Sequence, residues 1–229
     1  MRWVITGASR GIGLEFVKQL AARGEVVEAG ARDPSKAKEL AAIAASSGGR
    51  VRVHVCDVVS DASVKSFAEA LGSDPIDVLI NNAGIVGKRI SIEAPDCADM
   101  LATYDANALG PVRVTAALLP RVLASAVKRI VHITSGMGSI ADNTSGGSYG
   151  YRMSKAALNM MNKSLSVDFA SKGLTAIVMN PGWVQTDMGG KGAFTPVEES
   201  VSKMLGLIDK LTPSDSGSFL SFNGKTFPY

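Results

Sequence analysis

The stretch Trp3-Val-Ile-Thr-Gly-Ala-Ser-Arg-Gly-Ile-Gly13 decides the fold of this chain. Its β-branched run Val4–Thr6 predicts a buried strand, which breaks at Gly7, and a helix begins after Gly11. That helix has apolar residues at a spacing near the helical period, namely Ile12, Phe16, Val17 and Leu20. A strand, a glycine turn and a helix together direct unpaired helix N–H groups toward a phosphate.

The three glycines of this turn have separate expected tasks. We expect Gly7 and Gly13 to allow a tight turn and close packing of the helix on the strand, and Gly11 to let a pyrophosphate approach the backbone. The spacing is G-x-x-x-G-x-G and differs from the G-x-G-x-x-G of two-domain dehydrogenases. Because ordinary turns also contain glycines, phosphate binding is a hypothesis that the rest of the chain has to support.

The composition is that of a globular protein with enough residues for one large α/β domain. Of 229 residues, 46% are hydrophobic and 20% are charged, and the formal net charge is +3. This small, scattered charge argues against a nucleic acid partner, and no apolar run is long enough to span a membrane. We expect no metal site, because Cys56, Cys97, His54 and His132 show no metal-binding spacing. With no signal peptide ahead of the first strand, a reduced cytoplasmic protein is predicted.

Strand-like and helical segments alternate along the whole chain. The predicted strands are Trp3–Thr6, Val26–Ala31, Val51–Cys56, Val78–Asn81, Ile130–Thr134, Thr175–Met179 and Phe219–Phe222. The predicted helices lie near 12–23, 35–46, 61–71, 97–125, 152–171 and 197–210. This alternation predicts a parallel sheet of about seven strands with helices on both faces. We therefore predict a single Rossmann-type, doubly wound α/β domain over residues 1–229.

In such a sheet, ligands bind beyond the carboxyl ends of the strands, so the residues that follow each strand are informative. A dinucleotide site for NAD needs a carboxylate after the second strand, whereas a site for NADP has an arginine. Arg32 and Arg10 flank this place, Asp33 is better suited to cap the next helix, and Glu28 lies too early in its strand. The sequence therefore favours NADP(H) over NAD(H). The alternative is that the two arginines are solvent-exposed residues at the rim with no role in cofactor binding.

The third and fourth strands are followed by further polar groups. The Asp57 carboxylate can accept a hydrogen bond from an adenine amino group, or it caps the helix that starts near Ser60. The segment Asn81-Asn-Ala-Gly84 is small and amide-rich, which suits a turn that a flat ligand approaches closely.

Pro111 interrupts the long helix predicted over 97–125. Proline cannot donate to the carbonyl four residues back, which here belongs to Asn107. We expect a kink there and a carbonyl free to bind water, unless Pro111 only separates two helices.

Ser135 follows the fifth strand, and the next helix begins with Tyr151-Arg-Met-Ser-Lys155. Because positions i and i+4 share one helix face, the Tyr151 phenol and the Lys155 ammonium point the same way. A nearby cation is expected to lower the tyrosine pKa, which suits a proton donor.

These motifs resemble the short-chain dehydrogenase/reductase family over nearly the whole chain. The matching segments are Thr6–Gly13, Asp57, Asn81–Gly84, Asn107, Ser135, Tyr151-x-x-x-Lys155 and Pro181-Gly182. The compact length and the ending Leu211–Gly217 and Asn223-Gly224 resemble the branch of C-factor-like and sniffer-like carbonyl reductases.

The resemblance implies roles for individual residues. Tyr151 would donate a proton, Ser135 would polarise the carbonyl, Lys155 would bind the nicotinamide ribose and lower the Tyr151 pKa, and Asn107 would hold a relay water through its carbonyl. The implied cofactor-binding residues are Gly7, Ser9, Arg10, Gly11, Ile12, Gly13, Arg32, Asp57, Val58, Asn82, Ala83, Gly84, Tyr151, Lys155, Pro181, Gly182, Val184 and Thr186.

The implied function is NADPH-dependent reduction of a small ketone or aldehyde, the cofactor supplying the hydride. The alternatives are an NAD-dependent alcohol dehydrogenase and a regulatory protein that binds the dinucleotide with little turnover. The family also implies a homodimer or homotetramer through the helices near 97–125 and 152–171. Two local features depart from many members: an inserted loop, Asn143–Gly147, and a glycine-rich lid, Gly189–Gly192, with Trp183, Met137 and Met188 as candidate pocket residues.

Overall fold

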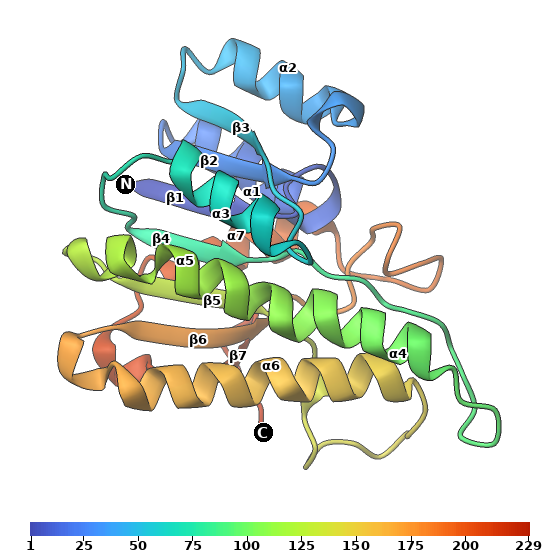
Figure 1. The fold of residues 1–229 in the computed structure, drawn as a ribbon. Helices are drawn as coiled ribbons and strands as arrows, with labels where there is room; N and C mark the ends of the chain where they lie inside the picture. The colour runs from blue at the N-terminus through green and yellow to red at the C-terminus, as the bar shows by residue number, and fades with distance from the viewer.

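The computed structural model describes all residues 1–229 and has a central sheet with helices on both faces (Figure 1). The strands are β1 Arg2–Thr6, β2 Val26–Ala31, β3 Val51–Val55, β4 Val78–Asn81, β5 Arg129–Ile133, β6 Thr175–Asn180 and β7 Phe219–Ser221. All neighbouring strands are parallel, in the order β3-β2-β1-β4-β5-β6-β7. The order reverses between β1 and β4, which is where an open α/β sheet binds its ligand.

Two hydrophobic cores lie on opposite faces of the sheet. The helices are α1 Gly11–Ala22, α2 Lys38–Ser46, α3 Asp61–Ala70, α4 Cys97–Tyr104, α5 Gly110–Ala124, α6 Tyr149–Asp168 and α7 Val197–Ile208. Trp3 and Ile5 of β1 belong to the core with α1, α2 and α7, whereas Val4 belongs to the core with α3, α5 and α6. Successive strand residues point to opposite faces, so the apolar runs of the strands supply both cores.

The predicted fold and the number of strands are confirmed, and strand ends differ from the predicted ends by one residue at most. Two helices have boundaries that differ from the predicted ones. The segment predicted as a helix from residue 35 begins with a 3-10 turn, Pro34–Lys36, and α2 starts only at Lys38. The helix with the Tyr-Lys pair begins at Tyr149 and ends at Asp168.

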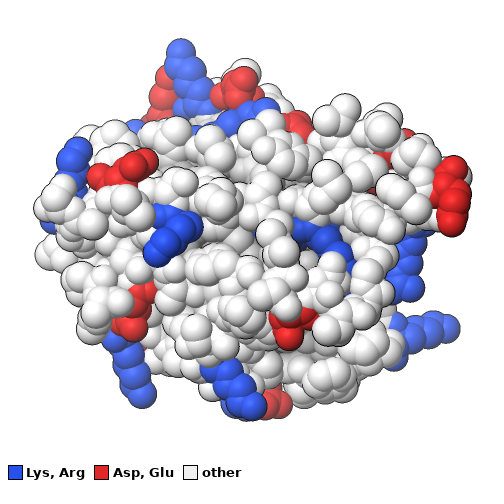
Figure 2. All heavy atoms as spheres, turned by 90° about the horizontal axis from the view of Figure 1, so that it is seen from below, with Lys and Arg blue, Asp and Glu red and all other residues white.

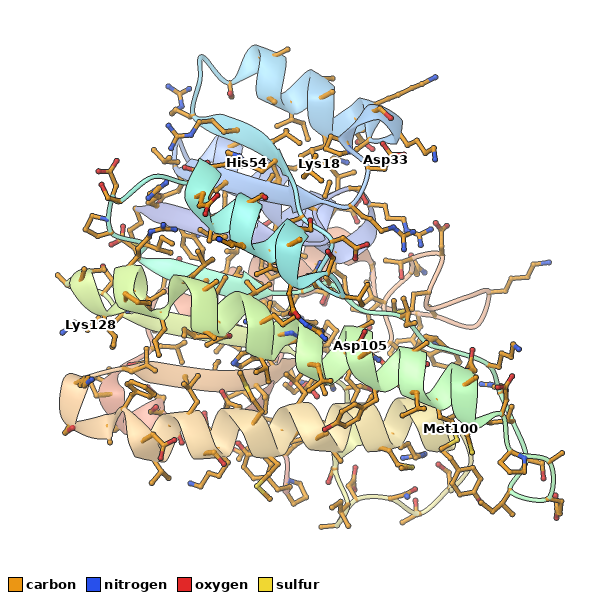
Figure 3. The ribbon with its side chains drawn as sticks, viewed as in Figure 1. Lys18, Asp33, His54, Met100, Asp105 and Lys128 are labelled. Atoms are coloured by element: carbon orange, nitrogen blue, oxygen red, sulfur yellow. The ribbon has the colours of Figure 1, made fainter.

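The helix predicted over 97–125 is interrupted at the predicted place. A π-helical turn, Asp105–Leu109, joins α4 to α5, and the Gly110 N–H donates to the Asp105 carbonyl. Pro111 has no N–H to continue the regular ladder, and one wider turn accommodates it. Asp105 lies on this turn, in the middle of the long helical segment (Figure 3), and pairs with Arg113 at 2.7 Å.

Glu28 is the centre of a charged cluster at the outer strands of the sheet. Its side chain is 1% exposed and contacts Arg2, Arg52 and His54, the histidine Nε2 lying 2.7 Å from the carboxylate. Burial raises the pKa of Glu28, but the hydrogen bonds from His54, Arg52 and Arg2 outweigh it and hold the pKa at about 2. Glu28 therefore links β1, β2 and β3 through its partners Arg2, Arg52 and His54.

No helix in the structure combines the length and the hydropathy that crossing a bilayer would require.

Candidate active site

The glycine turn has the close packing that its sequence predicted. Gly7 and Gly11 have positive φ angles of 66° and 55°. A Cβ at Gly13 would lie 2.2 Å from the Gly7 carbonyl oxygen. The Asn82 side chain donates to the Thr6 and Gly7 carbonyls at 3.0 and 3.1 Å. The motif after β4 thus fixes the turn after β1, and both lie at the reversal of strand order.

The first turn of α1 is open to an anion. Arg10 is its N-cap residue, no side chain caps the helix, and no acidic residue lies in the first turn. The N–H groups of the first turn and the positive end of the helix dipole are therefore available to a phosphate. The residues around Gly11 and Ile12 fit the pyrophosphate of a dinucleotide.

Exposed basic side chains follow the first two strands, at Arg10 and Arg32. Arg32 is exposed directly after β2, and Arg10 is exposed and pairs with Asp187 at 3.1 Å. The Asp33 carboxylate caps the 3-10 turn by accepting from the Ser35 N–H, which confirms the predicted cap, and also pairs with Lys36. Figure 3 shows Asp33 at the end of the loop after β2. Hydrogen bonds from Ser35 and Lys36 lower the pKa of Asp33.

The residues after β3 form the next part of this edge. Ser60 caps α3, and the Asp57 carboxylate accepts from the Val59 N–H at 3.3 Å, so Asp57 is not the helix cap. Val58 is buried and packs against Gly110. A Cβ at Gly110 would lie 2.9 Å from Val58 Cγ2.

Asn107 connects three segments through its side chain. Its Oδ1 accepts from the Ile85 N–H at 2.8 Å, and its Nδ2 donates to the Ile85 carbonyl and to Ser154 Oγ at 2.8 and 2.9 Å. A Cβ at Gly84 would lie 2.9 Å from Asn107 Oδ1. The fully buried amide therefore holds the loop after β4 against α6. The sequence indicated a role for the Asn107 carbonyl and did not predict this use of the side chain.

Ser135, Tyr151 and Lys155 come together at the carboxyl end of β5. Lys155 is 5% exposed, and its Nζ donates to the Ile133 carbonyl at 2.9 Å and lies 5.8 Å from the centre of the Tyr151 ring. Burial lowers the pKa of Lys155 to about 8. Burial also raises the pKa of Tyr151, while a hydrogen bond with Ser135 acts in the opposite direction.

The expected lowering of the Tyr151 pKa by Lys155 is therefore not what this structure shows. Desolvation of the half-buried phenol is the larger effect, because its surroundings disfavour the charged form of tyrosine. The neutral phenol still has the protonation state that a proton donor needs.

The segment after β6 covers the glycine turn. The Pro181 carbonyl accepts from Ser200 Oγ at 2.6 Å, Gly182 has φ of +84°, and Val184 is buried. The Thr186 methyl group would lie 3.3 Å from a Cβ at Gly11, so this segment reaches the turn.

The candidate pocket residues are only partly enclosed. Trp183 and Met188 are 51% and 52% exposed. Trp183 Nε1 donates to the Gly189 carbonyl at 2.8 Å, and its ring meets the edge of Phe194. Trp183 therefore anchors the glycine-rich lid and does not belong to the core.

Sequence reasoning missed Asn159, which lies one helical turn after Lys155. It accepts from Thr134 Oγ1 at 2.7 Å and donates to the Gly138 carbonyl at 3.1 Å, so it holds both sides of Ser135. The signal in the sequence is the spacing: Asn159 follows Lys155 by four residues, as Lys155 follows Tyr151, so all three lie on one face of the helix.

His132 is a core histidine on β5. It is fully buried beside Asn81, whose Nδ2 lies 3.1 Å from the histidine Nδ1. Burial, with the charge of Lys155, lowers its pKa to about 3. His132 is therefore neutral at physiological pH and is not a cation in this site.

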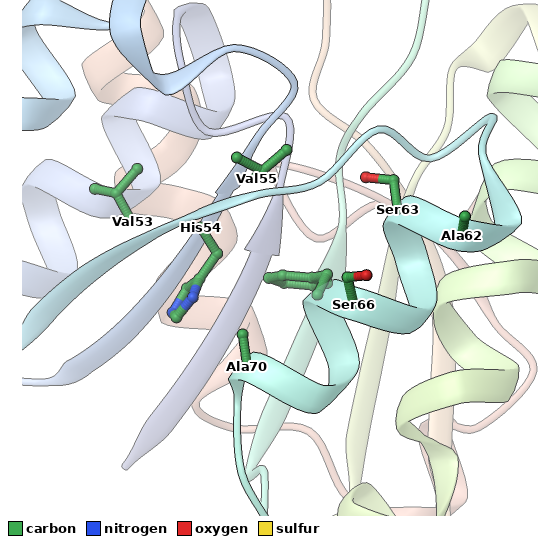
Figure 4. A pocket seen from close by; sticks show the side chains of 8 residues that line it. Val53, His54, Val55, Ala62, Ser63, Ser66 and Ala70 are labelled. Carbon is green, nitrogen blue, oxygen red and sulfur yellow. The ribbon is translucent and has the colours of Figure 1, made fainter.

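A hollow of about 560 Å³ lies elsewhere, between β3 and α3 (Figure 4). Valine, alanine and serine side chains line it together with His54 and Phe67. It lies along the edge strand and contains none of the candidate catalytic residues.

The amino-acid sequence is similar to known proteins. A family model described as short chain dehydrogenase matches residues 2–193. C-signal of Myxococcus xanthus is 49% identical over 166 residues, which are 72% of this chain and 100% of that protein.

Solved structures match the whole fold. NADPH-bound carbonyl reductase from chicken fatty liver has a TM-score of 0.93 and 35% identity, and the match covers 100% of this chain and 98% of that one. Carbonyl reductase Sniffer of D. melanogaster has a TM-score of 0.94 and 31% identity, with 100% and 99% of the two chains covered.

Proposed function

The chain belongs to the short-chain dehydrogenase/reductase family, and on that premise we propose that it is a carbonyl reductase that uses NADPH to reduce a ketone or aldehyde. The observation that carries the proposal is the grouping of Ser135, Tyr151 and Lys155 beside the open glycine turn. All of them lie at the strand ends where a doubly wound sheet binds its ligand.

The residues that would hold the cofactor are those that the resemblance implies: the glycine turn would bind the pyrophosphate, and Pro181–Thr186 would cover the nicotinamide. When bound, the dinucleotide supplies the hydride. Tyr151 gives its phenolic proton to the substrate oxygen, and Ser135 donates a hydrogen bond to the same oxygen. Lys155 places a positive charge beside the phenol as the proton leaves. The Asn107 carbonyl holds a water molecule, through which a proton returns to Tyr151.

A direct test combines binding and turnover. NADPH and NADH are titrated into the purified protein by fluorescence, and NADPH oxidation is then followed with benzaldehyde, hexanal, acetophenone and menadione. Binding of NADPH with turnover of at least one carbonyl supports the proposal. Binding without turnover of any carbonyl contradicts it.

We expect Arg32→Ala to weaken NADPH binding and to leave NADH binding almost unchanged. Arg32 is the exposed cation after β2, and a hydrogen bond to a charged group contributes about 1.5–3 kcal/mol, or roughly a 10- to 100-fold change in Kd. Fluorescence titration with both cofactors measures it. Arg23→Ala, at the opposite end of α1, is the control, since Arg23 pairs with Asp209. An equal loss for NADPH and NADH would contradict recognition of a 2′-phosphate and would favour an NAD-dependent alcohol dehydrogenase.

We also propose that residues 1–229 form one dinucleotide-binding domain that works in the cytoplasm as a homodimer or homotetramer. Apolar side chains are exposed along α4, α5 and α6, namely Leu101, Tyr104, Val112, Met153, Met160 and Val167. The face around α6 is mostly uncharged, with scattered basic and acidic groups (Figure 2). A second copy that covers these helices would bury them.

Light scattering is expected to give the mass of a dimer or tetramer, and Met160→Glu is expected to reduce it. Met160 is 66% exposed on α6, so a charge there leaves the isolated fold intact and disfavours burial by a partner. Val55→Glu, on the edge strand β3 and 58% exposed, is the matched control. A monomer at micromolar concentration would contradict the proposed assembly.

The similarity to C-signal favours one further candidate function: a signalling protein that binds the dinucleotide with little turnover. Pure binding does not require a proton donor, so the complete set of Ser135, Tyr151 and Lys155 argues for catalysis. Signalling that persists in a Tyr151→Phe variant would favour the alternative.

A further inference from the structure

Arg152, the residue after Tyr151, holds the loop that separates Ser135 from Tyr151. Its guanidinium donates to three backbone carbonyls and to one hydroxyl of this loop. The partners are Gly146 O at 3.0 Å, Gly147 O at 3.1 Å, Met137 O at 3.3 Å and Ser145 Oγ at 2.8 Å. One side chain on the first turns of α6 therefore bonds to both ends of the loop.

The contact with Met137 reaches the Ser135 hydroxyl. The Met137 N–H donates to Ser135 Oγ at 3.2 Å, while the Met137 carbonyl accepts from Arg152. Because the Ser135 oxygen accepts from Met137, the serine proton is free to be donated to another group. Ser135 lies near enough to the Tyr151 phenol to lower its pKa. Hydrogen bonds therefore lead from Arg152 through Met137 to Ser135, and Arg152 directly follows Tyr151 in the chain.

The loop needs such a tie because its own conformation is costly to order. Gly146 and Gly147 have positive φ angles of 62° and 65°, and Ser148 has φ of 47°, which a non-glycine residue rarely adopts. Other contacts of the loop include Asn143 Oδ1, which accepts from the Gly146 N–H, and the Ala141 N–H, which donates to the Tyr229 carbonyl. Two side chains of α6 connect the loop to the helix that carries Tyr151 and Lys155. Asn159 donates to the Gly138 carbonyl, near Ser135, and Arg152 bonds both to Met137 and to the far part of the loop, Ser145–Gly147.

We propose that Arg152 is a positioning residue for the reaction, which acts through Met137 to fix the Ser135 hydroxyl relative to the Tyr151 phenol. The inference rests on the proposed carbonyl reduction. This role of Arg152 explains how the Ser135 hydroxyl and the Tyr151 phenol keep a fixed relative position although an inserted loop separates them in the chain.

The test compares Arg152→Ala, Arg152→Lys and Ser145→Ala with the unaltered protein. For Arg152→Ala, kcat for the carbonyl that is turned over best falls about 10- to 100-fold, since a misplacement on the order of 1 Å has this effect. The Kd for NADPH is unchanged, because the glycine turn lies elsewhere. Arg152→Lys resembles Arg152→Ala, since one ammonium does not replace the guanidinium fork. Ser145→Ala keeps three of the four contacts and retains nearly full activity.

The pH profile separates positioning from a merely structural role. The Ser135 hydrogen bond lowers the pKa of Tyr151, so a loosened Ser135 moves the alkaline limb of kcat to higher pH. The inference is overturned if Arg152→Ala keeps the kcat of the unaltered protein and the alkaline limb of its pH profile does not move. It is also overturned if the loss of activity only parallels a loss of NADPH binding. If Arg152→Ala does not fold, Arg152→Lys gives the same measurements. Absence of turnover in the unaltered protein overturns the proposed function and this inference together.

Discussion

Replacing Tyr151 by phenylalanine is expected to lower kcat for carbonyl reduction about 10³-fold and to leave NADPH binding intact. The phenol is the proposed proton donor at the carboxyl end of β5, where Lys155 lies 5.8 Å from its ring centre. Its pKa is raised by burial above the ordinary value of 10, so the group is fully protonated at neutral pH. Phenylalanine keeps the ring and its packing and removes only the hydroxyl. Steady-state kinetics and NADPH titration measure the two effects.

Tyr149→Phe is the matched control for this variant. Tyr149 lies two residues earlier, is 36% exposed and has no lysine four residues on. We expect its loss to leave kcat almost unchanged. Residual activity of Tyr151→Phe close to that of Tyr149→Phe would mean that the phenol does not donate the proton.

Much of the fold was predictable because its signals are local. Short β-branched runs, such as Val4–Thr6, alternate with amphipathic helices, and this alternation largely determines a parallel sheet with two covered faces. The glycine turn was predictable for a related reason. Gly13 packs against Gly7 so closely that only glycine fits, and this constraint is visible in the sequence as a spacing.

The candidate site was predictable in its members but not in its contacts. Tyr151 and Lys155 share a helix face by spacing alone, whereas the pKa of Tyr151 depends on how deeply the sheet and the loops bury it. Asn107 was found through Pro111, yet its side chain bonds to Ile85 and Ser154, residues distant in sequence. Such pairings follow from the packing of α6 against the π-helical turn, which no local pattern encodes.

Glu28 shows the same limit in a strand. Its acidic side chain stands in an apolar run, and its partners Arg52 and His54 come from β3, while Arg2 comes from β1. The partners become visible only when the strand register is known, since Glu28 pairs with Arg52 across β2 and β3.

We therefore expect Glu28→Gln to lower the free energy of unfolding by about 3 kcal/mol at neutral pH, because it leaves Arg2 and its neighbours without their buried counter-ion. The folded pKa of Glu28 is about 2 and its ordinary value is 4.5. A depressed folded pKa gives stability that is present above 4.5 and is lost as the pH falls from there toward 2. The difference between the two proteins should accordingly be constant near neutral pH and shrink under acid conditions. Urea unfolding at several pH values measures it.

Glu39→Gln serves as the comparison, because Glu39 forms an ion pair with Lys18 but is 58% exposed. An exposed pair contributes at most about 1 kcal/mol, so this variant should unfold almost like the unaltered protein. If both substitutions change the free energy of unfolding by the same small amount, water solvates the arginines around Glu28 well enough to replace its carboxylate. Since Glu28 lies away from the strand ends, Glu28→Gln should also leave the preference between NADPH and NADH unchanged. A shift toward NADPH would place the carboxylate at the ribose, where an NAD-binding protein of this fold has its acid.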